Sequence, residues 1–245
     1  MSEVFPKAPI IEALIDIRAR LPENVSLTDL EKLHDRIKGE YPDKKPRNLW
    51  EGMVEFKQET PPRTEARVQR LGYLFSRADR TQVVQFRLDG FTFNRLRPYT
   101  HWEDIFPQAK RLWELYKTGV SPVRVTTVAV RYINSIEIPS KDFDFDDYFT
   151  STPKIPHGLP QILENFFMRT EIPFPAEEAK AVVIQTLANK QDPLKTAILL
   201  DVSVFRQLTL APDDESVWEI FEKFRDIKNK IFLNSLTDKT LDLFR

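Results

Sequence analysis

The chain has 245 residues, of which 41% are hydrophobic and 30% are charged, a composition typical of a globular protein with a large core. Thirty-six Lys and Arg residues oppose 37 Asp and Glu residues, for a formal net charge of -1, so no overall field favours binding to nucleic acid or to an anionic membrane. The sequence has no Cys, no signal-peptide pattern and no apolar run that could cross a bilayer, which predicts a cytoplasmic protein without disulfides or membrane association.

The first predicted element is a strand at Ile11–Leu21, where apolar residues occupy the odd positions and charged residues crowd the even ones. Such alternation is typical of a strand with one buried face. A short helix that ends near Gly39 follows, and a second helix opens at Thr100 in a capping box. Between these helices the pattern predicts strands at Trp50–Phe56, Val68–Phe75 and Gln82–Phe93.

A similar order of elements follows Gly119. A long strand is predicted at Val123–Ile138, and a long helix from Val217 places Ile220, Phe221, Phe224, Ile227 and Ile231 on one face. Between them the pattern predicts helices at Asp142–Phe149 and Leu159–Phe166, and strands at Phe167–Phe174, Ala179–Leu187 and Thr196–Phe205.

The two halves of the sequence match each other. An offset of 115 residues places Ala13, Ile15, Ile17 and Leu21 on Val128, Val130, Tyr132 and Ile136. With small drifts in offset, Leu88-Asp89 matches Leu200-Asp201, and Trp102 matches Trp218 inside a second capping box that opens at Ser216. This self-similarity predicts an internal duplication, with residues 1–120 and 121–245 as the two halves of one compact domain.

A β-α-β-β-β-α unit used twice predicts an α+β fold, in which an antiparallel sheet carries its helices on one face. This element order is that of the helix-grip and TATA-binding-protein-like folds. The other face of the sheet is then open to water or to a ligand. A fold by itself does not determine a function, so any function has to be inferred from the residues on that face.

Charged residues gather on the predicted open face. The outward positions collect Asp16, Arg18, Arg87, Asp89, Arg131 and Asp201. One interpretation is a solvated sheet whose neighbouring strands are joined by ion pairs, each worth roughly 0.2–1 kcal/mol. The other is a concave groove in which the Arg residues grip an anionic or peptide ligand and the carboxylates set specificity.

Common catalytic and metal-binding motifs are absent from the sequence. The six Gly residues lie too far apart for a dinucleotide-binding fingerprint, a phosphate loop or a nucleophile elbow. His34, His101 and His157 are isolated, which argues against zinc. The acidic run Asp142–Asp147 lacks the glycine and the final glutamate of a calcium loop. We therefore predict no metal and no cofactor.

The C-terminal segment is apolar at Leu233, Leu236, Leu241, Leu243 and Phe244. It either docks on the core of its own chain or forms a homodimer contact. The aromatic residues of the long helices lie at core spacing, so a base-stacking role is disfavoured.

Four segments together resemble one known family. They are Ala8-Pro-Ile-Ile-Glu-Ala13, Arg131-Tyr-Ile-Asn-Ser-Ile-Glu-Ile-Pro139, Ile198-Leu-Leu-Asp-Val202 and Phe232-Leu-Asn-Ser-Leu-Thr-Asp-Lys-Thr-Leu-Asp-Leu-Phe244. Over essentially its whole length the chain is similar to a sporadically distributed family of uncharacterised prokaryotic proteins. The resemblance implies no catalytic residues, and the patchy distribution of that family points to mobile-element or defence loci.

The sequence favours a non-enzymatic binding or regulatory protein, whose open sheet face receives a protein segment or a small anion. The alternative is a metal-assisted hydrolase or transferase acting on a phosphate-containing substrate, with Asp16, Asp89 and Asp201 as metal ligands. That alternative requires the three carboxylates to lie close together with no arginine between them. Nucleic-acid binding is opposed by the near-neutral net charge.

Overall fold

A computed structural model describes residues 5–57, 60–140, 143–161, 163–188 and 195–245, with the backbone alone for residues 50–57 and 60–67. The described residues form an α+β fold on one nine-stranded antiparallel sheet, as predicted. The strands are β1 (Ile10–Arg20), β2 (Asp43–Lys57), β3 (Thr60–Ser76), β4 (Gln82–Arg87), β5 (Gly90–Leu96), β6 (Arg124–Ile138), β7 (Phe167–Phe174), β8 (Ala179–Leu187) and β9 (Thr196–Leu210). Their order across the sheet is β2-β3-β4-β5-β1-β6-β9-β8-β7.

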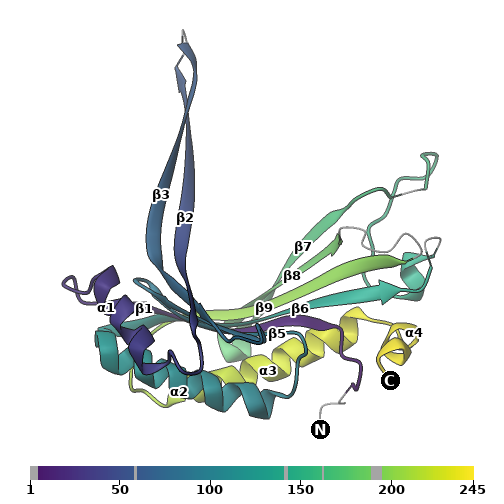
Figure 1. The fold of residues 1–245 in the computed structure, drawn as a ribbon. Helices are drawn as coiled ribbons and strands as arrows, with labels where there is room; N and C mark the ends of the chain where they lie inside the picture. Colours follow the sequence, from purple (N-terminus) through teal and green to yellow (C-terminus); the bar gives the residue numbers. More distant parts are fainter. Residues whose placement is uncertain (1–4, 58–59, 141–142, 162, 189–194) are drawn as a thin grey trace.

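Two long helices, α2 (Trp102–Val120) and α3 (Ser216–Ser235), lie on one face of the sheet (Figure 1). The shorter elements are α1 (Leu27–Lys32), η1 (Leu33–Arg36), η2 (Phe145–Asp147), η3 (Pro175–Glu177), α4 (Asp238–Leu241) and η4 (Asp242–Phe244). On the opposite face the long β2–β3 hairpin rises at one end and the β7–β8 strands rise at the other (Figure 1). No described helix has an apolar stretch long enough to cross a bilayer.

The core lies between the sheet and the two long helices. Ala13, Ile15 and Ile17 of β1 are buried on this side, so the predicted alternation of the strand is confirmed. From α2, the ring of Trp113 packs edge-on against Phe91 of β5 at a centroid distance of 6.0 Å. Burial of each large apolar side chain stabilises the fold by roughly 1.5–3 kcal/mol, and this holds the helices against the sheet.

The strand predicted at Gln82–Phe93 is instead two strands. β4 ends at Arg87, a tight turn occupies Leu88-Asp89, and β5 begins at Gly90. Asp89 therefore lies in a turn, whereas Asp201 lies inside β9, and the predicted match between them is wrong at the level of local structure. The buried positions change from even (Val84, Phe86) to odd (Phe91, Phe93) across the turn, and Asp89-Gly90 is a common turn sequence, so the sequence contained a signal that the single-strand prediction overlooked.

The helices predicted at Asp142–Phe149 and Leu159–Phe166 are also wrong. Of the first, only η2 is helical, and Asp142 lies outside the described residues. The described part of the second has no helix. In the second segment, Pro160 removes a backbone donor and restricts Leu159 before it. The first segment contains no proline, and nothing in the structure explains why it is not a longer helix.

The capping boxes predicted at Thr100 and Ser216 are not formed. The residues that precede α2 and α3 are His101 and Glu215, and neither makes a side-chain capping bond. At α3, Oδ1 of Asp214 accepts a hydrogen bond from the Ser216 N–H at 2.9 Å. A carboxylate one position further out thus satisfies a free N–H of the helix terminus.

The two halves of the chain differ in their element order. The first half contributes five strands, β1 to β5, and the second contributes four, β6 to β9. In the second half, η2 takes the place at which the first half has α1. The described elements therefore do not repeat β-α-β-β-β-α twice, as the sequence had predicted.

The C-terminal segment docks on the core of its own chain. Leu236, Leu241 and Phe244 are buried, and the Phe244 carbonyl accepts a hydrogen bond from the Lys7 N–H at 3.1 Å. This contact places the two ends of the described chain next to each other. It supports the first of the two roles expected for the segment.

Replacing Gly90 with alanine should lower the free energy of unfolding by about 2 kcal/mol. Gly90 has a φ of +142°, and an added Cβ would lie 2.2 Å from the Ile17 carbonyl oxygen of the neighbouring strand. Urea unfolding measures the loss. Gly39→Ala is the matched control, because nothing lies within 4 Å of its added Cβ. Equal losses in the two variants would contradict the close approach of β1 and β5.

Candidate functional site

Four of the six predicted site residues form one charged cluster on the open face of the sheet. Arg87, at the end of β4, donates from Nη2 to Asp16 Oδ1 at 3.0 Å and from Nε to Asp89 Oδ1 at 2.8 Å. Arg18 of β1 lies between the same two carboxylates, with an ion pair to Asp89 and a 3.4 Å contact to Asp16. Thr92 of β5 donates to Asp16 at 2.6 Å. Each arginine of the cluster thus already contacts both carboxylates.

The Arg87 side chain is the buried centre of this cluster, with an exposed fraction of 6%. Burial by itself lowers the pKa of an arginine, but Asp16 and Asp89 outweigh it, and the pKa of Arg87 is raised. The hairpin turn at Leu88-Asp89 brings Asp89 back beside Arg87, only two residues away. Arg87 is therefore a fixed positive charge that the fold itself neutralises.

The other two predicted site residues form a separate pair further along the open face. Arg131 of β6 donates to both carboxylate oxygens of Asp201 on β9, at 2.5–3.1 Å. These hydrogen bonds raise the pKa of Arg131 despite its partial burial. Asp201 is buried, whereas 43% of the Arg131 side chain is exposed. Each cluster therefore has one half-exposed arginine, Arg18 in the first and Arg131 in the second, whereas Arg87 is buried.

The alternative of a carboxylate metal site is disfavoured by the same contacts. Arg87 stands between Asp16 and Asp89, and Asp201 is bonded to Arg131 instead. Within the described ranges, no three His, Asp or Glu side chains lie close enough together to hold a metal ion. Divalent cations need several oxygen ligands around one point, and an arginine at that point repels them.

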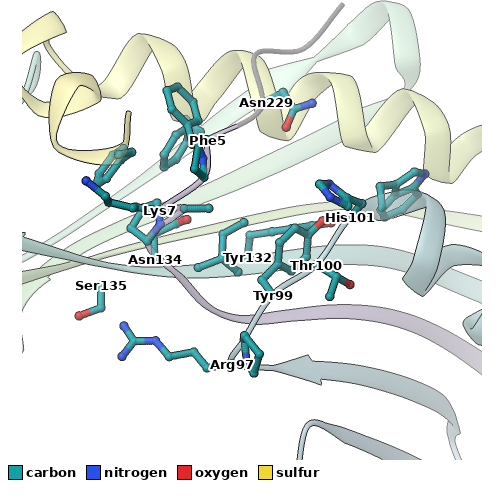
Figure 2. A pocket seen from close by; sticks show the side chains of 18 of the residues that line it. Phe5, Lys7, Arg97, Tyr99, Thr100, His101, Tyr132, Asn134, Ser135 and Asn229 are labelled. Atoms are coloured by element: carbon teal, nitrogen blue, oxygen red, sulfur yellow. Dashed lines mark hydrogen bonds between the residues drawn. The ribbon is translucent and has the colours of Figure 1, made fainter.

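A cavity lies beside the ends of the described chain, away from the six predicted site residues. Its volume is about 1140 Å³, and its walls come from the N-terminal segment before β1, the loop after β5, the strand β6, the helix α3 and the C-terminal segment. Figure 2 shows Tyr99 and Tyr132 next to each other within it, with Phe5 and Lys7 on one side and His101 on the other. With Lys195, which also lines it, six stretches of the described chain that are distant in sequence build one cavity.

Aromatic side chains form its apolar walls. Phe5 packs edge-on against Phe232 and Phe244, at centroid distances of 6.3 and 5.9 Å, which fixes the N-terminal segment to α3 and to η4. Tyr132 of β6 is buried, and its hydroxyl lies 3.3 Å from the hydroxyl of Tyr99. Burial raises the pKa of both tyrosines, so both stay neutral at physiological pH and can donate hydrogen bonds.

Cations outnumber carboxylates in the lining of this cavity. The lining contains Lys7, Arg97, Lys195, Arg225 and Lys228, against Glu103, Asp104 and Glu137. Arg225 pairs with Glu103 at 2.6 Å and Lys195 pairs with Glu137 at 3.1 Å. In the described structure, no carboxylate lies within ion-pair distance of the three remaining cations, of which Lys7 and Arg97 are exposed and Lys228 is partly buried.

Lys228 is the most unusual group in the cavity. Its Nζ lies over the ring of Tyr132, 3.9 Å from the centroid, and this cation–π contact is its one polar interaction among the described residues. Burial, with a smaller effect from the nearby Arg225 guanidinium, lowers the pKa of Lys228 from its usual value to about 7. Perturbed titratable groups in cavities are candidates for function.

Sequence reasoning missed this cavity, because its residues are spread over the whole chain. One signal was present on α3. Lys228 lies four residues after Phe224 and one residue after Ile227, so it falls within the apolar face of the helix. A lysine on an apolar face needs either a partner or a cavity, and here it has a cavity. The loop residues Arg97 and Tyr99 carry no comparable pattern.

No protein-family model matches the chain, and no curated protein is significantly similar to it.

Proposed function

We propose that this protein binds a small anionic ligand in the cavity beside its chain ends, which we call the terminal cavity. The observation that carries the proposal is the set of three cations, Lys7, Arg97 and Lys228, that line the cavity without carboxylate partners. Unpaired charges around a concave site favour a ligand of opposite sign. The sequence had favoured a binding protein for a small anion or a protein segment, and the first of these suits the terminal cavity.

The size and the walls of the terminal cavity limit the class of ligand that it can bind. A volume of about 1140 Å³ accommodates a molecule of metabolite size, and the aromatic walls suit a ligand with an apolar or planar body. The tyrosine hydroxyls and the Asn229 side chain supply neutral hydrogen-bonding groups beside the cations. A carboxylate or a sulfate-like oxyanion is the part of the ligand that Arg97 and Lys228 would contact.

Thermal unfolding with sulfate or glyoxylate, at an ionic strength kept constant with chloride, tests the proposal. Both anions should raise the melting temperature of the wild-type protein, because a ligand that binds only the folded state stabilises it. Arg97→Ala and Lys228→Met should each lose most of that rise. Arg36→Ala and Lys230→Met are the matched controls, because both side chains are exposed and lie outside the cavity lining. Equal rises in all five proteins would overturn the proposal.

A second candidate function, capture of a protein segment on the open sheet face, is favoured by two half-exposed arginines there. Arg18 and Arg131 leave 48% and 43% of their side chains exposed. An acidic extended segment on this face would offer carboxylates to both guanidinium groups. The Arg18→Ala/Arg131→Ala variant should then lose a partner that copurifies with the wild-type protein. Retention of that partner by the double variant would exclude the sheet face.

We also propose that the two halves derive from one duplicated unit with a TATA-binding-protein-like arrangement. The pairing of the central strands supports this. Ile15 pairs with Val130, while Ala13 pairs with Tyr132 and Ile17 pairs with Val128. A twofold axis at the Ile15–Val130 pair would exchange residues 115 apart, which is the offset found in the sequence. From this centre, the last strand of each half follows the first, and the others continue outward in reverse chain order.

We also propose that the protein is cytoplasmic and that it belongs to the sporadic prokaryotic family. The absence of Cys is consistent with a reducing compartment. A homodimer through the C-terminal segment has less support, because Leu236, Leu241 and Phe244 are already buried within their own chain.

A further inference from the structure

We propose that Lys228 captures the ligand covalently, as an imine with the carbonyl group of an anionic aldehyde or 2-oxo acid. The inference rests on the proposed anion-binding function of the terminal cavity and narrows its ligand class. It is carried by three features of the structure: the position of Nζ in the cavity wall, the lack of a carboxylate partner and the cation beside it.

The surroundings of Lys228 keep its amine reactive. A lysine nucleophile must be uncharged, and proteins achieve this by desolvation or by a second nearby cation. Both occur here, because Nζ stands over the Tyr132 ring and Arg225 lies one helical turn earlier on α3. Glu103 and Glu222, two carboxylates near this part of α3, are both engaged by Arg225. No described carboxylate therefore holds the proton on Nζ, and the face of the Tyr132 ring is the one described contact that favours the charged amine.

The chemistry balances within the terminal cavity. The uncharged Nζ attacks the carbonyl carbon, a C–N bond forms, and the carbonyl oxygen leaves as water with the two hydrogens of the amine. Hydrolysis reverses the step, so no oxidant or reductant is needed. The hydroxyls of Tyr99 and Tyr132 offer an O–H donor to the departing oxygen in the same cavity. Arg97 and Lys7 remain available for the anionic group of the ligand.

The lysines of α3 differ in their exposure, and this supplies an internal comparison. Lys223 and Lys230 lie on the same helix and are exposed, and neither lines the terminal cavity. Both are therefore expected to keep the ordinary reactivity of a charged surface lysine. All three residues are measured in one sample, so differences in folding do not affect the comparison.

Reductive trapping tests the proposal on the full chain. The protein is incubated with glyoxylate and cyanoborohydride at pH 7, digested, and analysed by mass spectrometry. Lys228 should be modified at least about tenfold faster than Lys223 or Lys230, because a much larger fraction of its amine is uncharged. Propionaldehyde, which lacks the carboxylate, should lose most of this preference. Arg97→Ala should slow the reaction with glyoxylate and leave the reaction with propionaldehyde unchanged.

The outcomes separate this inference from the proposed function. If glyoxylate raises the melting temperature but Lys228 reacts no faster than Lys230, covalent capture is wrong and anion binding stands. If glyoxylate neither stabilises the protein nor labels Lys228 selectively, both are wrong. If Lys228 reacts equally fast with propionaldehyde and glyoxylate, a reactive lysine is present but the anionic ligand class is overturned.

Discussion

Arg87→Ala is expected to lower the free energy of unfolding by about 3 kcal/mol, because the truncation leaves carboxylates without their buried partner. The Arg87 side chain is 6% exposed, and it contacts Asp16, Asp89 and the Thr92 hydroxyl. Transfer of a carboxylate out of water is costly unless it is paired and hydrogen-bonded. Urea unfolding, monitored by the fluorescence of the buried tryptophans, measures the loss.

Arg18→Ala is the matched control for this prediction. Arg18 contacts the same carboxylates, Asp16 and Asp89, but 48% of its side chain is exposed, so its loss should cost less than about 1 kcal/mol. In the Arg87→Ala/Asp16→Asn variant the loss should fall below the sum of the single losses, because the orphaned charge is removed. Similar losses for Arg87→Ala and Arg18→Ala would show that burial of the cluster does not set its energetics.

Sulfate binding in the terminal cavity should weaken by about tenfold between pH 6 and pH 8. The reason is that the pKa of Lys228 is about 7, so its charged fraction falls from roughly 0.9 to 0.1 across that interval. An anion favours the charged amine, so binding is strongest below pH 7 and is lost as the pH rises through it. Sulfate keeps its own charge throughout this range. Isothermal titration calorimetry at constant ionic strength measures the affinity.

The other charged groups around Lys228 do not account for such a change. Arg225 stays charged, the pKa values of Tyr99 and Tyr132 are raised by burial, and the pKa of Glu103 is lowered by hydrogen bonds from its own backbone and from Arg225. His101 also lines the cavity, and histidine is the side chain type whose charge most often changes in this pH range. The pH dependence should persist in His101→Gln and disappear in Lys228→Met. The reverse pattern would assign the dependence to the histidine.

Lys228→Met should also change the stability of the fold, and the lowered pKa of Lys228 sets the direction of that change. The pKa of Lys228 is lower in the folded protein than in the unfolded chain, so the unfolded chain binds the proton more tightly between about pH 7 and pH 10. This lysine therefore destabilises the fold most below pH 7, and less as the pH rises through that window. We expect the methionine variant to melt at a higher temperature than the wild type at pH 7. A lysine with a purely structural role would show the opposite change.

Much of the sheet followed from local pattern. The predicted bounds of β7 and β8 match those observed. Pro175 directly follows β7 and marks the end of its apolar run. The turn at Leu88-Asp89 was missed, although the buried apolar positions change from even (Val84, Phe86) to odd (Phe91, Phe93) across it. Pairing between strands distant in sequence then decided which charges meet, and this is why Asp201 binds Arg131 and lies apart from Asp16.

The terminal cavity could not be predicted in the same way. Its walls come from Phe5, Tyr99, Tyr132, Phe232 and Phe244, which approach one another only in the finished fold. Apolar periodicity assigns the last helix one buried face, but it does not distinguish a lysine covered by core from one that faces a void. The distinction at Lys228 required the position of the loop after β5, and that depends on the whole sheet.

The contact between Phe5 and Phe244 places residues near both ends of the described chain in the wall of the terminal cavity. Terminal segments are the parts of a fold that most readily fray. Fraying at either end would dismantle a wall of the cavity while the central strands β1 and β6 stay protected from hydrogen exchange. Ligand occupancy should therefore slow amide exchange at residues 5–9 and 236–244 well before it changes exchange in the sheet.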